Sequence, residues 1–213
     1  MKSFELINFI NNCPSEIKKE LKNKEVNFGE KLLIQNEECK YVYILLDGKI
    51  KTYHTDFTGT IYVEDIDAEP TIFGELEALI DREVVTTVET ISYCKILEIS
   101  KEGFIKWMEL DNKFSLFISK LIAERNYDCC KRERINAFYP LKYRVMYTIL
   151  NTIYKNNLGI TKDLLVEGVG SNIRSINRII NQLVQEEILE YKSGIITVKS
   201  IEKLENEVDY YKP

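Results

Sequence analysis

The pattern of hydrophobic and polar positions changes near the middle of the chain, from short extended runs to helical spacing. Between residues 26 and 100, runs rich in β-branched and aromatic residues recur roughly every 8–12 residues, with turn residues between them. This spacing predicts an all-β barrel or sandwich, and the lack of helical periods between the runs excludes a doubly wound sheet. Asp47-Gly48 lies between two apolar runs and predicts a two-residue hairpin turn, because both residues tolerate positive φ.

A helical pattern begins after Lys101, where apolar residues recur at every third or fourth position. Residues 112–138 contain neither Gly nor Pro, so they predict one long helix of about 25 residues that ends before Pro140. A helix of this length must bury its apolar stripe. The two candidates that can cover it are the β domain and the same helix of a second subunit.

The C-terminal part predicts a helix–turn–helix. An amphipathic helix is expected over residues 141–153, and residues 161–184 fit two short helices joined by a Gly-containing turn. Asn172 stands at the N-cap position of the second helix. One face of that helix is apolar, and the opposite face carries side chains that can hydrogen-bond base edges, namely Arg174, Arg178, Asn181 and Gln185.

Charge separates the two halves of the chain. The net charge of −5 alone argues against a nucleic-acid partner, but residues 1–112 carry 13 Lys and Arg against 22 Asp and Glu, whereas residues 113–200 carry 14 against 8. The polar face of the second helix could be an ordinary solvated face. The basic charge around it, and a hairpin expected over residues 190–199 with Lys192 and Lys199 as phosphate contacts, favour DNA binding.

Composition excludes several other classes of protein. Five Cys without an even framework, and an N-terminus without the apolar core of a signal peptide, predict a cytoplasmic protein. No apolar stretch approaches the roughly 20 residues needed to cross a bilayer, so no membrane partner is expected. The sequence shows no nucleophile–base pattern, metal-ligand spacing or phosphate-cradling Gly loop, so we expect no enzyme activity and no metal site.

Four stretches carry a family resemblance. Three of them stand in the correct order and spacing in the first half of the chain: residues 41–51, Phe73-Gly74-Glu75-Leu76 and residues 94–104. The fourth, over residues 160–183, contains Val169-Gly170-Ser171 and Arg174-Ser175-Ile176. They resemble, in this order, the opening β hairpin, the phosphate-binding cassette, the final strand leading into the next helix, and the winged helix of the Crp–Fnr transcription regulators.

The resemblance implies an α+β fold in three parts. These are an N-terminal double-stranded, jelly-roll-like β-roll that senses a ligand (residues 1–111), a long dimerisation helix (residues 112–139) and a C-terminal winged helix–turn–helix (residues 140–213). It also implies that Arg174 and Arg178 read bases and that Ser175 contacts phosphate. The residues expected at the DNA are Asn172, Ile173, Arg174, Ser175, Asn177, Arg178 and Lys192.

The resemblance also implies an effector pocket in the β-roll, lined by Gly74, Glu75, Leu76, Arg82, Thr86, Thr87, Cys129 and Cys130. In cyclic-nucleotide binders the cassette ends in an Arg that pairs with the ligand phosphate. Val84 and Val85 stand at that end here, so cyclic AMP is not expected. Glu75 could bind a ribose-like diol or cap a short helix, and the whole cassette could be a retained fold with an unused pocket. Vicinal Cys129 and Cys130 could form a redox switch or simply pack a helix interface.

The sequence therefore predicts a homodimeric, sequence-specific transcription regulator on a near-palindromic operator. The expected partners are double-stranded DNA, a second copy through residues 112–139, RNA polymerase and an unknown small-molecule effector. The alternative is a ligand-sensing β-roll module without DNA-binding function.

Overall fold

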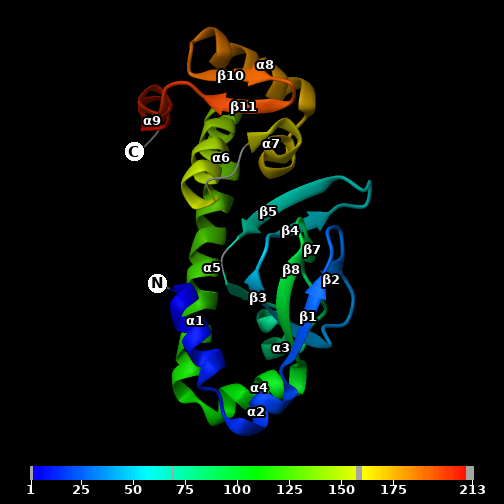
Figure 1. The fold of residues 1–213 in the computed structure, drawn as a ribbon. Helices are drawn as coiled ribbons and strands as arrows, with labels where there is room; N and C mark the ends of the chain where they lie inside the picture. The colour runs from blue at the N-terminus through cyan, green and yellow to red at the C-terminus, as the bar shows by residue number, and fades with distance from the viewer. Residues whose placement is uncertain (1, 69, 157–159, 210–213) are drawn as a thin grey trace. The chain divides into compact units, whose positions relative to one another are not determined.

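The computed structural model describes residues 2–68, 70–156 and 160–209, which fold into two compact units (Figure 1). The first unit comprises Met1–Thr60 and Glu64–Tyr127, and the second comprises Ile61–Val63 and Asp128–Pro213. Among the described residues, no helix is both long enough and apolar enough to cross a membrane.

The first unit contains two four-stranded sheets. One sheet has the antiparallel strand order β1 (Lys22–Val26), β8 (Cys94–Ser100), β3 (Tyr41–Asp47) and β6 (Thr71–Phe73). The other has the order β2 (Lys31–Leu33), β7 (Thr87–Thr90), β4 (Ile50–Thr55) and β5 (Ile61–Asp67). Buried apolar residues of both sheets form one core cluster, which includes Leu45, Ile50, Phe73, Val88 and Ile96. The strands predicted over residues 26–100 are confirmed, but the stretch is not all-β, because the short helix α3 (Glu75–Ile80) lies between β6 and β7.

The predicted hairpin at Asp47-Gly48 is wrong. β3 pairs with β8 and β6, whereas β4 pairs with β7, so this turn carries the chain from one sheet to the other. Only Gly48 of the two residues has a positive φ, at 107°. A Cβ atom there would lie 2.5 Å from the Tyr93 carbonyl oxygen and 2.6 Å from Cys94 Sγ. Glycine is required here for close backbone approach as well as for its φ.

Four helices accompany the two sheets of the first unit: α1 (Lys2–Asn11), α2 (Ser15–Glu20), α3 (Glu75–Ile80) and α4 (Lys101–Leu110). A second core cluster packs α1, α2, α4 and the first turns of the helix that begins at Asn112 against the sheet that contains β8, β3 and β6. At its centre the Trp107 and Phe114 rings stack with centroids 3.9 Å apart.

The long helix α5 (Asn112–Phe138) has the bounds that the sequence predicts. It begins where the Asp111 side chain accepts hydrogen bonds from the backbone N–H groups of Lys113 and Phe114, at 3.0 and 3.1 Å. The side chains of Phe114, Phe117 and Ile118 are buried in the core of the first unit, so the first turns of α5 pack there. The helix continues into the second unit, so it belongs to both.

The second unit contains four helices and a three-stranded sheet. The helices are α6 (Leu141–Asn156), α7 (Lys162–Val169), α8 (Ile173–Gln185) and α9 (Ile201–Asp209), and the strands follow the order β10 (Leu189–Lys192), β11 (Ile195–Val198) and β9 (Ile160–Thr161). One apolar core joins all these elements. The helix α9, which the sequence did not predict, contributes buried Leu204 and Val208 to it.

Candidate nucleic-acid interface and sensor site

The helices α7 and α8 form the helix–turn–helix that the sequence predicts. The Thr161 hydroxyl caps α7 by accepting from the Leu164 N–H at 3.2 Å, and Gly170 ends the helix in the left-handed region. Asn172 is the N-cap of α8, as predicted, because its side-chain oxygen accepts from the Arg174 N–H at 2.8 Å. Each helix therefore begins with a side-chain cap, which fixes the turn between them.

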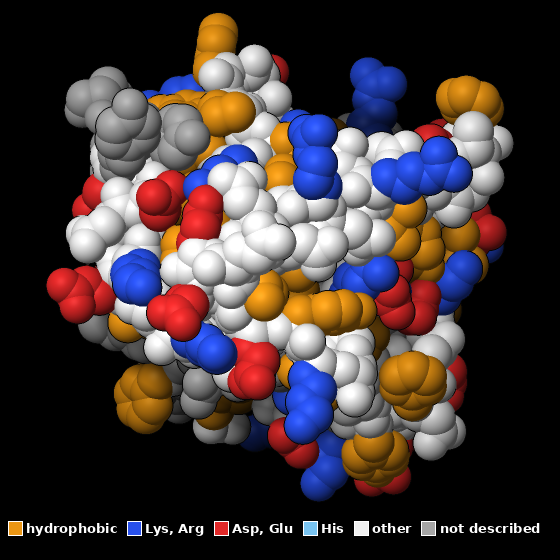
Figure 2. Space-filling view, turned by 90° about the horizontal axis from the view of Figure 1, so that it is seen from above, with side chains coloured by type: hydrophobic (Ala, Val, Ile, Leu, Met, Phe, Trp, Pro, Cys, Tyr) orange, Lys and Arg blue, Asp and Glu red, His pale blue; other side chains and the backbone are white. Residues whose placement is uncertain are grey.

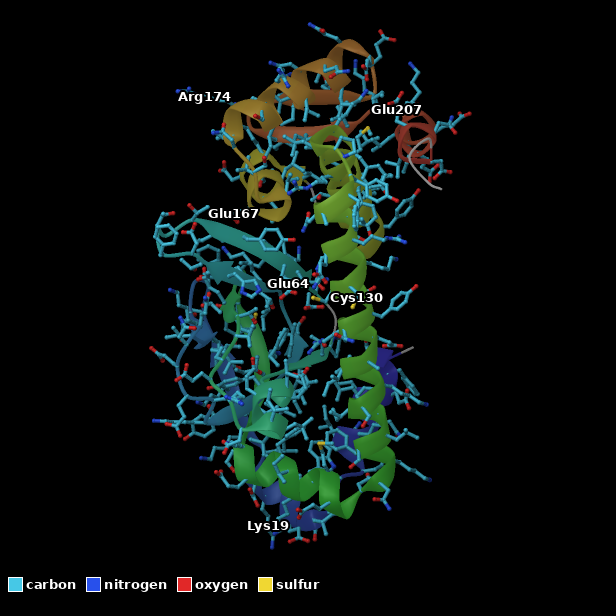
Figure 3. All side chains as sticks on the ribbon, turned by 180° about the vertical axis from the view of Figure 1, so that it is seen from behind. Lys19, Glu64, Cys130, Glu167, Arg174 and Glu207 are labelled. Carbon is cyan, nitrogen blue, oxygen red and sulfur yellow. The ribbon has the colours of Figure 1, made fainter. Side chains whose placement is uncertain are left out.

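The α8 helix has one buried and one exposed face. Ile176, Ile179, Ile180 and Leu183 are buried against α6 and α7. The predicted base-reading residues Arg174 and Arg178 are exposed, and neither pairs with a carboxylate of another described residue. Asn172 and Ile173 are exposed as well, with Ile173 at 47%, while Ser175 and Asn177 are half-buried beside them. Figure 3 shows Arg174 extending away from the helices of its unit.

The hairpin β10–β11 follows α8 as the predicted wing. Ser193 and Gly194 at its tip both have positive φ, 53° and 82°, as a two-residue hairpin turn requires. The Gly194 carbonyl oxygen accepts from the Lys162 N–H at 2.9 Å, so the tip is anchored to the start of α7. Lys192, the predicted phosphate contact, is exposed next to this turn.

Charged side chains of both signs stand on the surface that Figure 2 shows from above, with separate Lys and Arg side chains and with Asp and Glu side chains among them. Isolated cations on a polar background can position phosphates one at a time, but they give a weaker general attraction for DNA than a continuous basic patch.

The cassette residue Glu75 is buried and paired with an arginine. Its carboxylate receives a hydrogen bond from Arg125 Nη1, and the Glu75 side chain is only 4% exposed. Burial raises the pKa of the Glu75 carboxyl, and the positive charge of Arg125 acts in the opposite direction. Gly74 precedes it with φ of 85°, and no side chain caps the short helix α3. Glu75 is therefore not a side-chain cap of α3. Its predicted contact with a ribose-like diol stays a prediction.

The other residues predicted for the effector pocket lie in different environments. Leu76 and Arg82 are exposed, Thr86 is half-buried, and Thr87 is buried with its hydroxyl accepting from the Gln35 N–H at 3.1 Å. At the cassette end, Val84 is buried and Val85 is 48% exposed, so neither position offers a cation to a ligand phosphate. Their participation in a pocket stays a prediction.

Cys129 and Cys130 are exposed on α5, in the second unit, whereas Gly74 and Glu75 belong to the first. Figure 3 shows Cys130 on this helix. Their predicted role in lining a pocket stays a prediction, as does the redox switch. Within the described part of the chain, no group of three or more His, Cys, Asp and Glu side chains could hold a metal ion.

Part of the chain matches the model of a known protein family, and two known proteins are similar to it in sequence. Residues 23–111 match the family model of the cyclic nucleotide-binding domain. The chain is 19% identical over 181 residues to the cyclic AMP receptor protein of Thermus thermophilus, and the match covers 83% of each protein. It is 23% identical over 136 residues to lysophospholipase nte1 of Emericella nidulans, but that match covers 64% of this chain and spans only 9% of the length of that protein.

A solved structure extends the likeness to almost the whole chain. The Crp/Fnr-family transcriptional regulator TTHA1359 of Thermus thermophilus superposes with a TM-score of 0.75 at 18% identity, over 88% of this chain and 98% of that one. The chain has the Crp–Fnr regulator fold. The family resemblance and the α+β fold class predicted from the sequence are thereby confirmed.

Two arginines of this Crp–Fnr fold were not among the predicted site residues. Arg125 holds Glu75, and Arg144 of α6 donates to the last residue of α7. The sequence carries a signal for the first, because Arg125 continues the stripe formed by Phe114, Ile118 and Leu121. A charged residue on an apolar stripe needs a buried partner. No comparable signal marks Arg144.

Proposed function

We propose that the chain is a sequence-specific transcription regulator that binds double-stranded DNA through α8 and the β10–β11 wing. The observation that carries this proposal is the exposure of Arg174 and Arg178 on one face of a helix whose opposite face is buried. They stand four residues apart, so both guanidinium groups project from the same side of α8. Bidentate Arg contacts to guanine are the commonest specific contact in the major groove.

Site selection from random duplexes, followed by gel shifts, tests this proposal. Arg174→Ala and Arg178→Ala should each weaken binding to the selected site by roughly 5–150-fold, which corresponds to about 1–3 kcal/mol per base contact. Lys192→Ala should weaken binding to all sequences alike and reduce the salt slope by about 1. Lys19→Ala is the matched control, because Lys19 is exposed on α2 in the first unit and should leave affinity unchanged. Full affinity in the Arg174→Ala/Arg178→Ala double variant would instead favour a ligand-sensing module without DNA function.

We further propose that the active species is a homodimer through residues 112–139. Four exposed residues of α5 recur at heptad spacing: Leu116, Ala123, Cys130 and Ala137. A strict seven-residue repeat of apolar and small side chains is the seam that two parallel helices share. Leu116 is 57% exposed, so its side chain is accessible to the same helix of a second copy. Two-fold symmetry then predicts an operator with half-sites about one helical turn apart.

Thiol cross-linking tests this seam directly. A short bifunctional maleimide should join two copies of Cys129→Ser, which keeps the seam residue Cys130. The matched variant Cys130→Ser keeps Cys129, one position away from the seam, and should cross-link several-fold less. Equal cross-linking of both variants, or a monomer in equilibrium sedimentation, contradicts the dimer.

Because we propose a DNA partner, we expect the protein to act in the cytoplasm. We expect it to act without catalysis, through contact with DNA and RNA polymerase. No turnover of cyclic nucleotides or lysophospholipids by the purified chain is the expected outcome of activity assays.

A further inference from the structure

The ammonium group of Lys142, near the start of α6, lies between carboxylates of two other helices. Nζ is 3.2 Å from Glu186 Oε2, at the end of α8, and 3.2 Å from Glu207 Oε2, on α9. The Lys142 side chain is only 21% exposed. Glu186 is held by a second donor, because Gln182 Nε2 lies 2.8 Å from Glu186 Oε1. The cation and the carboxylate at the end of α8 are therefore both fixed in position.

The end of α8 needs a cation from another element. Its last turn has no basic residue, its C-cap is Glu186, and exposed Glu187 follows. The free carbonyl groups at a helix C-terminus carry partial negative charge, to which a carboxylate adds.

This negative charge lies within reach of the proposed DNA contacts. Arg178 stands eight positions before Glu186 in the sequence, which is about 12 Å along the axis of α8. An unpaired carboxylate at that distance repels DNA phosphates at low salt, where the Debye length is about 30 Å. It repels them much less at physiological salt, where the Debye length is about 8 Å.

We propose that Lys142 is a positioning residue for DNA recognition. It neutralises the acidic end of α8 and holds that end against α6, so it supports DNA binding through Glu186 without touching the duplex. The helix α9 takes part through Glu207, which keeps the ammonium group beside Glu186. This inference rests on the proposed function, because it requires that α8 binds DNA.

Gel shifts of the full chain on a selected duplex, at about 10 mM and about 150 mM salt, test the proposal. Lys142→Met removes the cation and should weaken binding about three- to tenfold at the lower salt concentration and less than about twofold at the higher one. Lys142→Arg keeps the charge and should bind like wild type. The Tm of Lys142→Met should fall by no more than about 4 °C, because partly exposed ion pairs contribute little stability. Unchanged affinity of Lys142→Met at low salt overturns the proposal.

Two double variants separate an effect through Glu186 from a direct contact between Lys142 and a DNA phosphate. Lys142→Met/Glu186→Gln removes both charges and should restore the affinity of wild type. Lys142→Met/Glu207→Gln has the same net charge but leaves Glu186 unpaired, so it should stay as weak as Lys142→Met.

The double variants also distinguish the failure of this inference from the failure of the proposed function. If Lys142→Met/Glu186→Gln stays as weak as Lys142→Met, or if both double variants recover equally, the role of Lys142 is overturned and DNA binding stands. If wild type binds no selected duplex, both proposals are overturned.

Discussion

The Arg144 guanidinium donates a hydrogen bond from Nη2 to the Val169 carbonyl oxygen, 2.6 Å away. Val169 is the last residue of α7, and its carbonyl is one of the acceptors that a helix C-terminus leaves without an intrahelical donor. The hydrogen bond therefore connects α6 to the end of α7, just before the turn that leads into α8. Arg144 Nε, in contrast, is buried without a hydrogen-bond partner among the described residues.

Arg144 is therefore predicted to position α8, the helix proposed to contact base edges, without itself touching DNA. Arg144→Met keeps the length of the side chain and removes the donor, which should destabilise the second unit by about 1–3 kcal/mol and weaken operator binding about tenfold. Arg144→Lys should recover part of both losses. Gel-shift affinity and thermal unfolding measure the two effects. Unchanged affinity in a destabilised Arg144→Met variant would show that the bond serves stability only.

Gly48 and Gly59 provide a matched pair for the sensor domain. Both have positive φ, but only Gly48 has backbone within reach of an added Cβ, whereas nothing lies within 4 Å at Gly59. Gly48→Ala should cost about 2 kcal/mol or more through strain and overlap, and Gly59→Ala about 1 kcal/mol through φ alone. Urea unfolding of the two variants gives the comparison. Equal costs would mean that the Gly48 turn relaxes without penalty.

The buried thiol of Cys39 should make the folded protein less stable at alkaline pH. Burial, assisted by the negative charge of Glu77, raises the pKa of its thiol to about 11 from an ordinary 9.0. Because the folded pKa is the higher one, the stabilising contribution is complete below pH 9 and disappears as the pH rises to about 11. The loss amounts to about 3 kcal/mol at most, because each pKa unit corresponds to about 1.4 kcal/mol. Urea unfolding at several pH values should show a flatter profile for Cys39→Ala than for wild type. Parallel profiles would contradict the assignment.

The helix α9 is predicted to be a structural part of the DNA-binding unit. Leu204 is fully buried in the core of that unit, while Ile201, one turn earlier, is 43% exposed. Leu204→Ala should cost about 2–4 kcal/mol, and Ile201→Ala less than about 0.5 kcal/mol. Thermal unfolding of the two variants tests the difference, and a small effect at Leu204 would mean that α9 packs loosely.

Local signals predicted the elements that local interactions determine. The bounds of α5 follow from a stretch without breakers that ends before Pro140. The start of α8 follows from the capping chemistry of Asn172, and its orientation follows from the periodic isoleucines. The wing follows from the Ser193-Gly194 turn.

The elements that the sequence did not predict depend on distant partners. β1 has four exposed residues before Val26 and no apolar alternation, so only its pairing with β8 makes it a strand. β7 begins only at Thr87, after the β-branched pair Val84-Val85, because the backbone N–H of Val84 donates to the Glu37 carbonyl oxygen outside the sheet. The pair of Glu75 and Arg125 joins residues fifty positions apart, and no local pattern connects them.

The side chain at the first position of α8 has a consequence for the sequence the protein can read. Ile173 presents only carbon to solvent, so a base edge opposite it can offer it nothing better than a methyl group. In a duplex that group belongs to thymine. Uracil pairs as thymine does but lacks the methyl group. Replacing the thymines of each half-site with uracil one position at a time should therefore weaken binding only at the position that contacts Ile173.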